Sequence, residues 1–235
     1  MNILKSLEAL KEYVNENISN SNEPTRKLDN GIRAMALKVQ EDYKFDFGLP
    51  NYNYVVRDLK DAVKLSYPNE EEWIESFAER DYVSNVILGK SVDIEKIVRE
   101  IKAYDNKIDK NGGLNFKDGY ELTHLIWALN QVCQDNNIVK NYKELMSDSL
   151  LNLHSTLPNS DLKTECIYFL TLIDLSKVEE EYIREIEESQ LPDGTFKGTM
   201  MMDPDTERED YFLIYHHLCL ALLSLYNYNN TIITH

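Results

Sequence analysis

The fold is indicated by a stretch in the middle of the chain, Thr123–Leu129, which reads THLIWAL and lies in a run of apolar residues. Two later stretches repeat its pattern: Thr164–Leu170 reads TECIYFL, and His216–Leu222 reads HHLCLAL. The three stretches begin at residues 123, 164 and 216, so they are 41 and 52 residues apart. Two-helix repeats recur every roughly 40–50 residues. The pattern therefore predicts a series of helical hairpins.

The second half of the chain contains two kinds of predicted helix. Three segments are apolar nearly all round, which is typical of helices buried on every side: Tyr120–Gln134, Leu162–Leu175 and Asp210–Tyr228. Between them, Asn141–His154 and Val178–Ser189 carry charges on one face and are predicted to lie outside the buried helices. A single hairpin cannot cover its own apolar face, so each is expected to pack against its neighbours.

The whole chain, residues 1–235, is predicted to be one all-α domain. Its 43% of hydrophobic residues are enough to fill one core, and its few glycines and prolines fall where helices should end. We expect N-terminal helices in residues 1–110 and the clearest hairpin repeats in residues 111–235. The other predicted helices are Ile3–Ile18, Thr25–Tyr43, Tyr54–Leu65, Glu70–Phe77 and Val92–Ala103, and the segment nearest to strand-like alternation is Asn51–Val56.

The turn before the last buried helix carries a motif. Residues Gln190–Phe196 read QLPDGTF, and an earlier turn, Asn111–Phe116, reads NGGLNF. The later turn resembles the glutamine–glycine–aromatic repeat of the squalene and terpene cyclases, whose α/α-toroid fold is shared by protein prenyltransferase β-subunits and lanthionine cyclases. The resemblance covers roughly residues 111–228, with Phe196 where that repeat usually has Trp. It implies an α/α-toroid, closed or incomplete, in which the motif braces helices against one another.

Composition argues against several functions. The formal net charge is −16, and no block of Lys and Arg interrupts the acidity. Binding to nucleic acid or to an anionic membrane depends on basic residues, so neither is expected. The N-terminus mixes charges into its apolar residues, and no segment approaches the roughly 18 apolar residues of a membrane span. Cys133, Cys166 and Cys219 lie in apolar runs and are expected to be buried thiols of a cytoplasmic protein.

Polar residues within the buried helices form the candidate site. His124, Glu165 and His217 stand in register in the three aligned stretches, so a ring of helices is expected to bring them together. Buried carboxylates and imidazoles are unfavourable unless they pair or bind a cation. Three interpretations stay open: a polar network in the core, a metal-free acid–base site, and a zinc or iron site. For the metal site, His216 and Cys219 are spare donors.

Two functions from different classes are compatible with the sequence. The first is a small cytoplasmic enzyme of cyclase, lyase or hydrolase type that acts on an apolar or peptide-like substrate in the cavity of the toroid. Its catalytic residues would be His124, Glu165 and His217, with or without a metal, and Asp161 adds a carboxylate one helical turn before Glu165. The second is a non-catalytic helical-repeat adaptor, whose acidic surface binds a basic partner.

Overall fold

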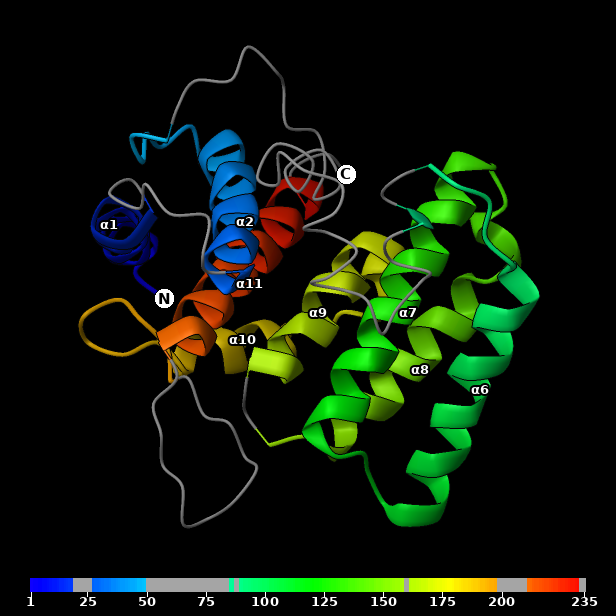
Figure 1. Ribbon diagram of the computed structural model, residues 1–235. Coiled ribbons are helices and arrows are strands. Elements are labelled where there is room, and N and C mark those ends of the chain that lie inside the picture. The colour runs from blue at the N-terminus through cyan, green and yellow to red at the C-terminus, as the bar shows by residue number, and fades with distance from the viewer. Residues whose placement is uncertain (19–26, 50–84, 87–88, 159–160, 198–210, 233–235) are drawn as a thin grey trace.

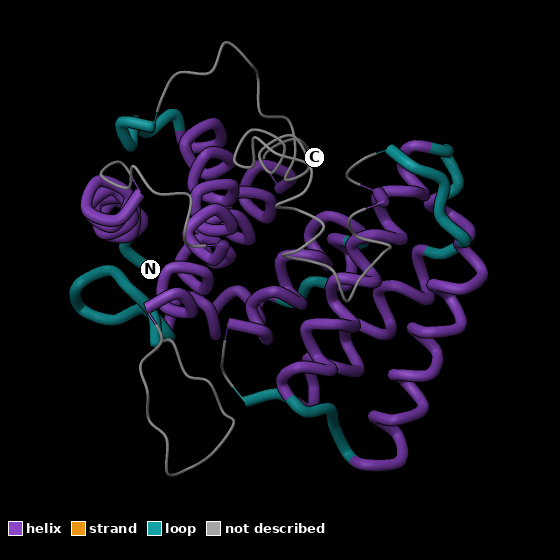
Figure 2. Tube along the Cα trace, in the orientation of Figure 1, coloured by secondary structure: helices purple, strands orange, loops and turns teal. Residues whose placement is uncertain are grey.

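The computed structural model describes residues 1–18, 27–49, 85–86, 89–158, 161–197 and 211–232. Within these residues every regular element is a helix (Figure 2), and the β-type pairing is an isolated bridge between Gln190 and Phe196. The all-α prediction is therefore confirmed for this part of the chain. The α-helices are α1 (Ile3–Tyr13), α2 (Lys27–Tyr43), α6 (Ile94–Asn111), α7 (Phe116–Asp135), α8 (Lys143–Thr156), α9 (Asp161–Ile173), α10 (Glu180–Glu188) and α11 (Tyr211–Ile232). A π-helical turn, Val14–Ile18, continues α1, and short 3-10 turns at Val139–Asn141 and Leu175–Lys177 precede α8 and α10.

Helix α6 is longer than predicted, while the other described helices agree with their predicted segments to within a few residues. It continues to Asn111, although its second half is mostly polar. Ile97, Ile101 and Ile108 keep one buried face along its whole length, which explains the extension. Gly112 ends the helix with a φ of 73°, in the left-handed region that glycine enters without strain. The predicted segments Asn51–Val56, Tyr54–Leu65 and Glu70–Phe77 lie outside the described residues.

Helix α9 lies at the centre of the described structure (Figure 1). It packs against α7 and α8 on one side and against α11 on the other. Helix α11 packs in turn against α2 and α1, and α6 packs on α7 and α8 at the edge of the molecule. Helices α7, α9, α11 and α2 therefore form one continuous row.

The core is built from apolar side chains of every described α-helix. Leu125 is only 7% exposed, and Leu129, Leu170 and Leu222 are fully buried. This burial confirms that α7, α9 and α11 are covered on most sides, as their apolar sequences predict. No helix in the described ranges is long and apolar enough to cross a membrane.

Tyrosines attach the two N-terminal helices to α11. The hydroxyl of Tyr43 donates a hydrogen bond to the carbonyl oxygen of Leu222 at 2.7 Å. The ring of Tyr13 stacks on that of Tyr215 with their centroids 3.8 Å apart. A tyrosine buries its ring and still needs a partner for its hydroxyl, so the first contact adds direction to apolar packing.

The Gln190–Phe196 turn joins the end of α10 to the start of α1. The side-chain amide of Gln190 accepts a hydrogen bond from the backbone nitrogen of Asn2 at 2.7 Å and donates to Oγ of Ser6 at 2.7 Å. The hydroxyl of Ser6 donates to the carbonyl oxygen of Gly194 at 2.8 Å. The turn is thus a brace between parts of the chain that are far apart in sequence.

Replacing Gly194 by Ala should destabilise the protein far more than replacing Gly112 by Ala. Both glycines have positive φ, 95° and 73°, so alanine strains the backbone in both. At Gly194 a Cβ would also lie 2.6 Å from the carbonyl oxygen of Lys5, whereas at Gly112 it would meet nothing within 4 Å. In urea denaturation we expect a loss of about 1 kcal/mol for Gly112→Ala and about 3 kcal/mol for Gly194→Ala. Equal losses would contradict the close contact between the brace and α1.

Candidate functional site

Two carboxylates lie on one face of α9. Asp161 and Glu165 are four residues apart, so their side chains are neighbours on the helix surface. They are 0% and 2% exposed. Burial of ionised carboxylates is unfavourable unless hydrogen-bond donors or cations compensate for the lost water. The groups around these two side chains therefore define the site.

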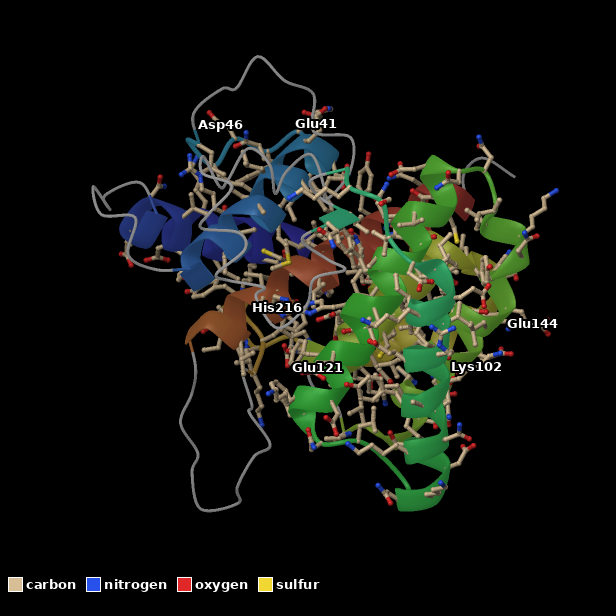
Figure 3. All side chains as sticks on the ribbon, turned by 45° about the vertical axis from the view of Figure 1, so that its right-hand side comes forward. Glu41, Asp46, Lys102, Glu121, Glu144 and His216 are labelled. Atoms are coloured by element: carbon tan, nitrogen blue, oxygen red, sulfur yellow. The ribbon has the colours of Figure 1, made fainter. Side chains whose placement is uncertain are left out.

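His216 of α11 faces both carboxylates. Its Nδ1 lies 3.1 Å from Oδ2 of Asp161, and its Nε2 lies 3.9 Å from Oε2 of Glu165. An ionised carboxylate only accepts hydrogen bonds, so Nδ1 carries a proton and donates to Asp161. This leaves Nε2 directed towards Glu165. The His216 side chain is 12% exposed and lies on the side of α11 that faces α7 (Figure 3).

Helix α7 contributes Tyr120 and His124, which are also one helical turn apart. The hydroxyl of Tyr120 donates to the same Oδ2 of Asp161 that His216 contacts. Nε2 of His124 lies 3.9 Å from Oε1 of Glu165, and the His124 side chain is 29% exposed. Five side chains from three helices thus meet, and we call them the α9 carboxylate cluster: Tyr120, His124, Asp161, Glu165 and His216.

One oxygen of Asp161 has no donor among the described residues. Tyr120 and His216 both bond to Oδ2 of Asp161, whereas Oδ1 is buried without a hydrogen-bond partner in the part of the chain that the structure describes. A buried acceptor that lacks a partner destabilises a protein by about 1–3 kcal/mol, more when it is charged. A bound group could supply the donor that Oδ1 lacks.

The neighbouring carboxylates control the charge of His216. Burial by itself lowers the pKa of this imidazole, but its hydrogen bond to Asp161 and the negative charges of Asp161 and Glu165 outweigh burial and raise the pKa above its ordinary value. The protonated form of His216 is therefore favoured more than that of an ordinary imidazole.

His217, the next residue, lies in a different environment. Adjacent side chains on a helix point about 100° apart, and His217 packs on Phe196 with ring centroids 4.7 Å apart. Its Nδ1 lies 3.3 Å from the carbonyl oxygen of Lys197, and its Nε2 lies 2.8 Å from Oγ1 of Thr164. Burial lowers its pKa to about 4, so the ring is neutral at pH 7. Nδ1–H then donates to the carbonyl, and Nε2 accepts from the hydroxyl.

The structure brings His124 and Glu165 together, as predicted, but it places His216 where His217 was expected. Each ring nitrogen of His217 has a hydrogen-bond partner, so a metal ion held by His124, Glu165 and His217 would require His217 to give up its bond to Thr164 or to the Lys197 carbonyl. Among the described residues, no group of three or more His, Cys, Asp and Glu side chains has an arrangement that could hold a metal ion. Burial also raises the pKa of the Cys219 thiol, which disfavours the thiolate that metals bind. A zinc or iron ion remains a prediction.

The sequence pattern does not predict the contacts of Tyr120 and His216 with Asp161. The sequence does contain a signal for the first, because Tyr120 and His124 share the four-residue spacing of Asp161 and Glu165. Only the rotation of α11 relative to α9 distinguishes His216 from His217, and the sequence pattern does not contain that rotation.

No protein-family model, curated protein or solved structure matches the chain.

The adjacent histidines should titrate on opposite sides of the ordinary histidine pKa of about 6.5. In ¹H–¹⁵N NMR spectra of the imidazole rings, we expect a pKa above that value for His216 and near 4 for His217. Asp161→Asn should lower the pKa of His216 because it removes the hydrogen-bonded charge, with a much smaller effect on His217. His216→Gln and His217→Asn assign the two signals. A His216 pKa below 6.5 in the unmodified protein would contradict the described electrostatics.

Proposed function

We propose that the chain is a small enzyme that transfers protons in a reaction of cyclase, lyase or hydrolase type on an apolar or peptide-like substrate. His216 and Asp161 are its acid–base pair. The proposal is carried by the 3.1 Å contact between Nδ1 of His216 and the buried Asp161, which makes Nε2 the atom that exchanges protons. A carboxylate that fixes one nitrogen of a histidine sets its tautomer and orientation, as acid–base catalysis requires.

The other members of the cluster have complementary roles in this proposal. The raised pKa of His216 keeps the imidazolium available as a general acid. Glu165 lies 3.9 Å from Nε2 of both His216 and His124, too far for a direct hydrogen bond. A substrate group that approaches these atoms could receive a proton from Nε2 of His216 and lose one to Glu165. Tyr120 positions Asp161 through its hydroxyl.

We further propose that the helices form an α/α-toroid, as the Gln190–Phe196 motif implies. In this arrangement the contacting row α7, α9, α11 and α2 is the inner layer, and α6, α8, α10 and α1 are the outer layer. Every member of the α9 carboxylate cluster then comes from an inner helix. Residues at similar depth on inner helices converge near the axis of a toroid, where a substrate would bind.

Two alternative functions are compatible with the chain. The adaptor alternative rests on the net charge of −16 and gives the buried cluster no role. The metal-assisted alternative keeps the cluster and adds zinc or iron. Metal analysis of protein purified without a histidine tag decides the latter, because a stoichiometric metal would support it and a negligible content after incubation with either metal would contradict it.

His216→Gln should abolish turnover without unfolding the protein. The test incubates purified protein with a library of short peptides and of apolar esters and alcohols, and follows each compound by mass spectrometry. Loss of a general acid lowers rates by about 10²–10⁴-fold, so we expect at least a 100-fold loss for any compound that the unmodified protein converts. Glu185→Gln is the matched control, because Glu185 pairs with Lys163 outside the cluster. Undiminished turnover by His216→Gln, or no conversion of any compound, would count against the proposal.

Stability measurements separate the functional residues from the structural histidine. His217→Ala leaves Thr164 and the Lys197 carbonyl without their partner and opens space beside Phe196, so it should lower the free energy of unfolding by about 2–3 kcal/mol. Glu165→Gln removes a buried charge, and His216 can then lose its proton. We expect a change within about 1 kcal/mol, or a gain. Losses of similar size in both variants, measured by urea denaturation, would indicate that the cluster is only a core network.

A further inference from the structure

The strongest indication of a ligand is the free acceptor of Asp161. Its side chain is fully buried. Its Oδ2 already accepts hydrogen bonds from Tyr120 and His216, whereas its Oδ1 has no donor among the described residues. The one lysine between the two carboxylates on α9, Lys163, is directed elsewhere, since its Nζ lies 2.8 Å from Oε2 of Glu185 on α10. The fold therefore supplies no lysine to this oxygen from its own helix.

The charges around Oδ1 select among possible ligands. Asp161 and Glu165 place two carboxylates in the cluster, so an anionic ligand would be repelled. A purely apolar ligand would leave Oδ1 buried without a donor. A cation that carries N–H groups both satisfies the acceptor and compensates for the negative charge.

Aromatic rings beside the carboxylates favour an organic cation. The ring of Tyr120 lies against Phe116 with centroids 4.6 Å apart, and it lies 6.1 Å from the rings of His124 and His216. Aromatic faces attract ammonium and guanidinium groups. A metal ion is less favoured, because no described group of donors has the arrangement to hold one.

We infer that the α9 carboxylate cluster binds the protonated nitrogen of an amine or guanidinium compound, with Oδ1 of Asp161 as the acceptor. The inference rests on the proposed function and names the class of its substrate: a compound, such as a basic peptide or an alkylamine, that carries a cationic nitrogen next to the atoms that His216 protonates. The nitrogen stays bound as a cation, and no covalent bond to it is formed or broken.

Methylammonium and guanidinium chloride are the probes, and tetramethylammonium is the control, because it has the same charge but no N–H donor. Each salt is titrated to about 50 mM at constant ionic strength, set with sodium chloride so that screening of exposed charges is equal throughout. Binding is read from the imidazole signals of the unmodified protein by NMR. We expect a saturable shift of the His216 signal with methylammonium or guanidinium, a much smaller one with tetramethylammonium, and no shift of His154, which lies beside Tyr182 and Glu185.

Asp161→Asn should weaken methylammonium binding at least tenfold, whereas Glu185→Gln should leave it unchanged. The inference is overturned if neither N–H cation shifts His216, if tetramethylammonium binds equally well, or if a folded Asp161→Asn binds as the unmodified protein does. Saturable binding of Zn²⁺, Mn²⁺ or Mg²⁺ alone would also overturn it and favour a metal site. If Asp161→Asn does not fold, the comparison of the three cations in the unmodified protein still decides.

The outcome is separable from that of the proposed function. If no amine binds but His216→Gln loses turnover of a neutral compound, the substrate class is wrong and the acid–base proposal stands. If methylammonium binds at Asp161 but His216→Gln retains turnover, the cation site is supported and the acid–base role of His216 is wrong.

Discussion

The burial of two carboxylates on α9 is the constraint on which the rest of the structure depends. Helix α9 is central, and its apolar side chains require cover from α7, α8 and α11. Apolar burial stabilises by about 25 cal/mol per Å² but is not directional, so it accepts many rotations of the neighbouring helices. Asp161 and Glu165 are far more demanding, because a buried charge without donors destabilises by several kcal/mol. Tyr120 from α7 and His216 from α11 meet part of this demand at Oδ2 of Asp161, and their hydrogen bonds favour particular rotations of both helices about α9.

The brace and the site are parts of one arrangement. Gln190 holds the turn after α10 against the start of α1, and the same turn ends at Phe196, which is fully buried. Phe196 packs on His217, and His217 bonds to Thr164 of α9. These contacts are made by His217, the residue next to His216, and they restrict the rotation of α11. The sequence motif that resembles the cyclase repeat therefore contributes to the candidate site indirectly. Its contact with His217 helps to set the direction of the adjacent His216 side chain.

Much of the fold follows from local sequence, and much of the site does not. Burial of Leu129, Leu170 and Leu222 is readable from apolar residues that recur all round a helix. The sequence pattern does not predict the full length of α6, because Ile108 is the one buried residue among the mostly polar residues of its second half. Matching stretches by their apolar pattern aligned His217 with Glu165, yet side chains one residue apart differ by about 100° in direction. Such a difference is decided by helix packing, which involves residues tens of positions apart and leaves no trace in a repeat pattern.

The two adjacent histidines differ in how completely the fold satisfies the polar groups around them. His217 is a neutral ring in an apolar setting, and both of its nitrogens have a partner that the fold supplies. The α9 carboxylate cluster is different, because Asp161 keeps an oxygen that no described residue satisfies, although Tyr120 and His216 lie close enough to share its other oxygen. Asp42 and Asp105 also keep one buried oxygen without a hydrogen-bond partner among the described residues, but Asp161 is the carboxylate that shares its bonded oxygen between two donors and has a fully buried side chain. His216 and Tyr120 thus share one oxygen of Asp161, and the proposed cation would supply a donor to the other.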